Sequence, residues 1–86
     1  MNMQISDRPL TVTNSTLSTL IAELGAECSR VQALIHQLQL PSLTPNQQAE
    51  ILGELLAATV HLYTHCDMDF QNLLADEMEK LPDEQE

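Results

Sequence analysis

Two stretches of regularly spaced apolar residues, separated by a pair of prolines, constrain the fold of this chain more than any other feature. Between residues 17 and 38 the apolar side chains recur at intervals of three and four, which places them on one side of an α-helix. A similar pattern follows Pro45. Pro41 and Pro45 interrupt the pattern because proline lacks an amide donor and restricts the residue before it. The sequence therefore predicts a hairpin of two long helices, over residues 15–40 and 45–66.

The start of each predicted helix carries residues that suit an N-cap. Asn14, Ser15 and Thr16 can each accept a hydrogen bond from the first turn of the first helix. Thr44 precedes a proline and is followed by Gln47 at the spacing of a capping box, which predicts the start of the second helix. The apolar stripe of this second helix consists of Leu52, Leu55, Leu56, Thr59, Tyr63 and Cys66.

A shorter third helix is predicted after a turn at Asp67 and Met68. Asp69 is a suitable N-cap for a helix over residues 70–81, and Pro82 ends it. The chain then divides into an irregular N-terminal lead-in (1–13), a single helical domain (14–81) and an acidic tail (82–86).

The composition favours an all-α fold that works as an oligomer. Only two glycines and two aromatic residues are present, so the core must be built from aliphatic side chains, which suits the packing of helices on one another. A chain of 86 residues buries a modest fraction of its surface, and the apolar stripes are too wide for one subunit to cover. We expect a dimeric or tetrameric helical bundle. The residues expected to be buried, and to form the oligomer interface, are Leu24, Val31, Leu52, Leu56 and Tyr63.

The charge of the chain excludes two classes of partner. The formal net charge is −10, with Arg8, Arg30 and Lys80 as the three basic residues. Binding to nucleic acids or to anionic membranes requires several lysines or arginines, so neither is expected. The acidic residues concentrate in the stretch 67–86, which is interpreted as a solvated surface or as a docking segment for a basic partner protein.

The location expected from the sequence is the cytoplasm. No targeting signal is visible, and no stretch approaches the ~20 apolar residues that a membrane-spanning helix needs. Cys28 and Cys66 lie on apolar faces of the predicted helices, where buried free thiols are expected rather than a disulfide.

Two pairs of glutamates are candidate metal ligands. Glu23 and Glu27 are four residues apart on the first helix, and Glu50 and Glu54 are four apart on the second. Four carboxylates that meet across a helical hairpin can hold a divalent cation. The other interpretation is two ordinary polar faces, since Glu50 and Glu54 point away from the apolar stripe of their helix.

A histidine pair on the second helix is a second candidate. His61 and His65 are four residues apart and are predicted to share a face with Glu54. Such a pair binds a transition metal only when a third ligand is added, and on a single helix it is more often solvated.

Several segments of the chain resemble the MazG-like all-α nucleotide pyrophosphohydrolases. The resemblance rests on the segments Leu20–Glu27, Ala49–Leu56, His61–Tyr63, Met68–Phe70 and Glu77–Leu81, and it covers roughly residues 17–81. It implies a fold of packed helices. It also implies a magnesium site in which an E-x-x-E pair and an E-x-x-D pair bind the metal, while water attacks between the α- and β-phosphates of a nucleotide and releases pyrophosphate.

The family's ligand pattern is only partly present. Glu23 matches the first ligand, and Glu54 stands where the family has an aspartate, but the other two positions are Ala26 and Ile51, which cannot bind a metal. We therefore expect a non-catalytic oligomerising or protein-binding module with an eroded metal site and no cofactor. The alternative is a magnesium-dependent nucleoside triphosphate pyrophosphohydrolase that uses a rearranged set of Glu23, Glu27, Glu50 and Glu54.

Overall fold

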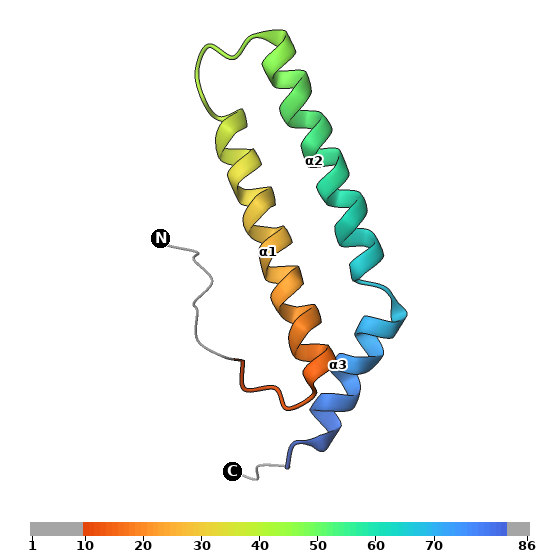
Figure 1. The fold of residues 1–86 in the computed structure, drawn as a ribbon. Coiled ribbons are helices and arrows are strands. Elements are labelled where there is room, and N and C mark those ends of the chain that lie inside the picture. The colour runs from red at the N-terminus through yellow and green to blue at the C-terminus, as the bar shows by residue number, and fades with distance from the viewer. Residues whose placement is uncertain (1–9, 83–86) are drawn as a thin grey trace.

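Three α-helices make up most of the protein in the computed structural model, which describes residues 10–82 (Figure 1). Helix α1 spans Ser15–Leu38, α2 spans Pro45–His65 and α3 spans Met68–Lys80. The long helices α1 and α2 run antiparallel, and α3 turns back to pack against the first turns of α1. The all-α prediction of a hairpin with a short third helix is confirmed. The predicted lead-in (1–13) and acidic tail (82–86) fall largely outside the described residues.

Local capping explains where each helix begins. The side chain of Asn14 accepts a hydrogen bond from the amide of Leu17, at 2.9 Å. The capping box predicted for α2 is present, because Thr44 and Gln47 exchange side-chain to backbone hydrogen bonds of 2.9 and 3.0 Å. Both predicted starts are confirmed, and each satisfies amide donors that the helix itself leaves without partners.

The predicted start of α3 is wrong by two residues. The N-cap is Asp67 rather than Asp69, and its carboxylate accepts from the amide of Phe70 at 2.9 Å. Asp67 has an extended backbone, which lets its side chain reach the third residue of the helix. Asp69 instead lies inside the first turn, where a negative charge is favourable at the positive end of the helix dipole.

The main core of the hairpin lies between α1 and α2. Leu34, Ile51 and Ala58 are buried against one another, and partly buried apolar residues surround them: Val31, Leu38, Leu43 and Leu55. The buried positions 51 and 58 of α2, together with the partly buried Leu55 between them, follow the spacing of a helix face. This face of α2, centred on Ile51 and Ala58, packs against α1.

At the other end of the hairpin, α3 is held by both apolar and polar contacts. Leu17 and Phe70 are buried there, and the Phe70 ring meets the His65 ring edge-on at a centroid distance of 4.8 Å. The amide and hydroxyl of Thr13 donate to Oε2 of Glu77, at 3.3 and 3.1 Å. Because the first turn of α1 contains no acidic residue, Glu77 of α3 supplies a negative charge near the start of α1.

Within a single chain, the expected burial of the second helix's apolar stripe is wrong, and its expected place in an oligomer interface stays a prediction. Leu52, Leu56 and Tyr63 are 49%, 65% and 85% exposed, whereas Leu24 and Val31 on α1 are partly buried. One residue corresponds to ~100° around a helix, so contact through Ile51 turns its neighbour Leu52 away from α1. The apolar surface of α2 is wider than the strip that α1 covers.

Both cysteines differ from the sequence expectation in the same way. Cys28 and Cys66 are free thiols, as predicted, but both are exposed rather than buried. Cys28 lies within α1, and Cys66 is the C-cap residue that follows α2.

Little of the chain is shielded from solvent. Among residues 10–82 only five are buried: Leu17, Leu34, Ile51, Ala58 and Phe70. The Cα radius of gyration is 17.0 Å, compared with ~12 Å for a compact domain of this length. No helix within residues 10–82 has the length and apolar character needed to cross a membrane.

Candidate functional site

The most distinctive surface of the hairpin is an exposed apolar face. It consists of Ile35 on α1 and of Leu52, Leu56, Thr59 and Tyr63 on α2, with Val60 at its edge, and we call it the outer apolar face. Ile35 is 43% exposed and Val60 is 54% exposed. Large apolar side chains that gather on one side of a small protein make that side a candidate binding surface.

The opposite side of the hairpin is polar, and two contacts between α1 and α2 define it. Nη2 of Arg30 lies 3.4 Å from Oε1 of Glu54, and Nδ1 of His61 lies 3.7 Å from Oε2 of Glu27. We call this the ion-pair face. Leu52 and Leu56 are each two residues from Glu54, and therefore lie ~200° around α2 from it.

The same rotation assigns the α1 residues to the two faces. Ile35 is five residues after Arg30, which places it ~140° around α1 from the ion pair. Ala33 is three residues after Arg30 and so lies on the ion-pair face. The apolar surface therefore extends across both helices of the hairpin.

Charge is separated between these faces and along the hairpin. The acidic residues of α2 are Glu50 and Glu54, four apart and so on the same side of the helix. None of the residues that form the outer apolar face is charged. Residues 31–49, which include the turn between α1 and α2, contain no Asp, Glu, Lys or Arg. A neutral surface of this kind can dock on another apolar surface without burying a charge.

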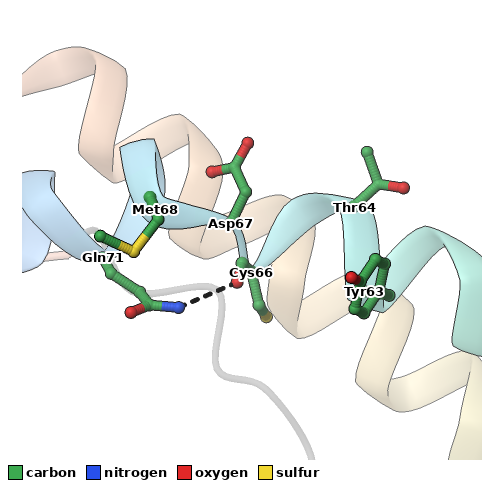
Figure 2. Close-up of a pocket in the computed structure, with 6 residues that line it drawn as sticks. All are labelled: Tyr63, Thr64, Cys66, Asp67, Met68 and Gln71. Carbon is green, nitrogen blue, oxygen red and sulfur yellow. Dashed lines mark hydrogen bonds between the residues drawn. The ribbon is translucent and has the colours of Figure 1, made fainter.

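An open hollow continues the exposed apolar surface beyond Tyr63. It lies where α2 turns into α3, has a volume of about 500 Å³ and is lined by Tyr63, Thr64, Cys66, Asp67, Met68 and Gln71 (Figure 2). The side-chain amide of Gln71 donates to the backbone carbonyl of Cys66 at 3.1 Å, which fixes one wall. Met68 is 66% exposed. The hollow is open and mainly apolar, so it is better suited to a side chain of another protein than to a small polar ligand.

The four candidate carboxylates do not act as one group. Glu27 contacts His61, and Glu54 contacts Arg30, so each faces a basic side chain of the other helix. Glu23 is exposed. Glu50 is also exposed and lines a separate hollow of about 280 Å³ near the turn between α1 and α2.

This arrangement does not fit a magnesium site. Within residues 10–82 there is no group of three or more His, Cys, Asp or Glu side chains placed to hold a metal ion. Magnesium requires several oxygen ligands around one point, whereas the guanidinium of Arg30 occupies the space beside Glu54. Ile51, at one of the resemblance's ligand positions, is buried against α1, whereas Glu50 beside it is exposed.

The histidine pair is also divided between two surroundings. His61 is exposed beside Glu27, whereas His65 is partly buried against Phe70. Nε2 of His65 is buried without a hydrogen-bond partner. The packing of His65 on an aromatic ring gives it a structural role at the junction of α2 and α3.

The sequence contained a signal that α2 has two apolar surfaces, although not which of them faces α1. Positions 51, 55, 58 and 62 alternate spacings of four and three, and so do positions 52, 56, 59 and 63. Two parallel rows on one helix indicate that two different surfaces can be covered. Reading them as a single stripe concealed the second surface.

No protein-family model, curated protein or solved structure matches this chain. The resemblance to the MazG-like pyrophosphohydrolases therefore stays a prediction.

Proposed function

We propose that this chain is a non-catalytic association module, which docks a second helical surface on its outer apolar face. The observation that carries the proposal is the exposure of Leu52, Leu56 and Tyr63 on a face without charge. The small number of buried residues adds support, because a helical chain of this length gains stability when a partner covers more of its apolar surface.

The energetics favour a reversible contact. Covering a fully exposed leucine or a side chain of similar size contributes ~1.5–3 kcal/mol. The four or five large side chains of the outer apolar face are 43% to 85% exposed, so each contributes part of this amount. Association costs ~4–15 kcal/mol in lost translational, rotational and side-chain freedom. Because the gain and the cost are of similar size, the net free energy of association is small, which suits a reversible complex.

The alternative function is magnesium-dependent hydrolysis of a nucleoside triphosphate with release of pyrophosphate. The observation in its favour is Glu27, whose Oε2 is buried without a hydrogen bond and lies on the same face as Glu54. Arg30 would have to leave Glu54 before that carboxylate could bind a metal. The test is magnesium-dependent pyrophosphate release over a panel of nucleotides. Release that is lost in Glu23→Gln would establish the enzyme and contradict the non-catalytic proposal.

Site-specific photo-crosslinking tests the association module directly. A photoreactive amino acid replaces Leu56 in one variant and Ala33, on the ion-pair face, in the control. We expect adducts with one defined protein, identified by mass spectrometry, from position 56 alone, and we expect Tyr63→Asp to abolish them. Equal adducts from both positions, or none from position 56, would contradict the proposal.

A second docking surface stays a prediction from the sequence. The acidic stretch from Asp67 onward includes Asp69, Asp76 and Glu79, which are exposed. Such a surface suits a basic partner protein.

A further inference from the structure

We infer that the outer apolar face binds the same face of a second copy of this chain, with the two α2 helices antiparallel and Leu52 of each copy opposite Tyr63 of the other. This inference rests on the proposed association function and specifies its partner. Three features support it: the spacing of the apolar row, the distribution of charge and the size of the face.

The spacing of the row suits a two-fold axis. Leu52, Leu56, Thr59 and Tyr63 are separated by four, three and four residues, a pattern that reads the same in both directions. A two-fold axis that is perpendicular to α2 and lies at the level midway between residues 57 and 58 therefore brings Leu52 opposite Tyr63 and Leu56 opposite Thr59. Each copy then contributes the same residues to both halves of the contact, as in the two-fold interfaces of most homodimers.

Charge distinguishes the antiparallel arrangement from the parallel one. The end of the hairpin beside α3 carries Asp67, Asp69, Asp76, Glu77 and Glu79 against Lys80, whereas residues 31–49 at the other end contain no Asp, Glu, Lys or Arg. A parallel pair would place the two acidic ends side by side. An antiparallel pair places each acidic end beside the uncharged end of the second copy.

The length of the hairpin makes this separation effective. Helix α2 has 21 residues and is therefore ~32 Å long. This distance is about four Debye lengths at physiological ionic strength, so the two acidic ends scarcely repel each other.

The face is large enough for a dimer of modest affinity. With helix axes 8–10 Å apart and side chains on both flanks, the hairpin is roughly 20 Å wide, so its whole side along α2 measures ~600 Å², and the outer apolar face forms the middle of this side. Two such sides bury at most ~1,200 Å², at the lower end of the range for specific interfaces, which suits a weak dimer.

Disulfide trapping tests the partner and its direction together. Both native cysteines are exposed, so Cys28→Ser and Cys66→Ser give a background without thiols and with no buried polar group. Leu52→Cys and Tyr63→Cys are made separately in this background, with Ala33→Cys as the control. All three substituted positions are exposed. Circular dichroism verifies that the helices form in every variant.

We expect the mixture of Leu52→Cys and Tyr63→Cys to oxidise to a disulfide-linked heterodimer, about tenfold in excess over the homodimers of either alone, because pairing holds the two thiols at high effective concentration. The Ala33→Cys control should remain monomeric on the gel. Homodimers that form from Leu52→Cys alone and from Tyr63→Cys alone, without the heterodimer, would show a parallel pair and overturn the inference.

No crosslink in any mixture would also overturn the inference. The association function would survive that result if photo-crosslinking at position 56 still trapped a different, defined protein, and it would fail with the inference if position 56 trapped nothing.

Discussion

The outer apolar face and the ion-pair face are built from the same two helices, yet they differ in almost every physical respect. On the ion-pair face, Arg30 contacts Glu54, and Nδ1 of His61 lies 3.7 Å from Oε2 of Glu27, so polar side chains of α1 and α2 meet within one chain. On the outer apolar face, Leu52, Leu56 and Tyr63 have no such neighbours and remain in contact with water. This difference is the basis of our proposal that a second molecule covers the outer apolar face, whereas α1 and α2 supply the contacts of the ion-pair face to each other.

The largest expected effect is on the free energy of unfolding, and it separates Ile51, on the side of α2 that packs against α1, from Leu52 on the outer apolar face. Ile51→Ala should lower the free energy of unfolding by about 2–4 kcal/mol, because it leaves a cavity beside Leu34 and Ala58. Leu52→Ala, one residue away and about half exposed, should cost the isolated chain under about 1 kcal/mol. Urea denaturation of both variants at low concentration measures the difference. Equal losses would mean that Leu52 and Ile51 are packed alike, which would erase the contrast between the faces.

The next effect is on the affinity of association, and it compares Leu56, on the outer apolar face, with the adjacent Ala57. Leu56→Asp should weaken association by about 100-fold, because it places an unpaired charge in an apolar contact. Ala57→Asp adds the same charge to an exposed position outside the apolar row. It should change the affinity by less than about threefold, as expected for a surface substitution. Sedimentation velocity over a concentration series gives both values, and similar weakening by the two substitutions would point to net charge rather than to the face.

The smallest effect is expected on the ion-pair face. Arg30 and Glu54 have side chains that are 54% and 57% exposed, so solvent screens their attraction. Glu54→Gln should therefore change the free energy of unfolding by no more than about 0.5 kcal/mol. Its association should match the wild type. A marked loss of association in this variant would place the binding surface on the wrong side of the hairpin.

Local chemistry made most of the fold predictable. Proline at positions 41 and 45 and the capping residues Asn14 and Thr44 act within one helical turn, so the ends of the long helices follow from adjacent residues. The start of α3 did not follow so directly. Asp67 and Asp69 are both good N-caps, and only the path of the chain after α2 selects the first.

The side of α2 that faces α1 was not predictable from periodicity. Two apolar rows, beginning at Ile51 and Leu52, lie ~100° apart on the helix, and either would satisfy the spacing of a packed face. The choice depends on contacts with distant residues such as Leu34. The contact of Arg30 with Glu54 was not predictable for the same reason, because it joins residues 24 positions apart across the hairpin.

The most direct test of this account is the mass of the intact chain in solution, measured by sedimentation equilibrium at high micromolar concentration and 0.15 M salt. We expect a reversible equilibrium that approaches twice the chain mass of 9.6 kDa, with Leu56→Asp held at the monomer mass. A wild-type chain that stays at 9.6 kDa throughout this range would contradict self-association through the outer apolar face.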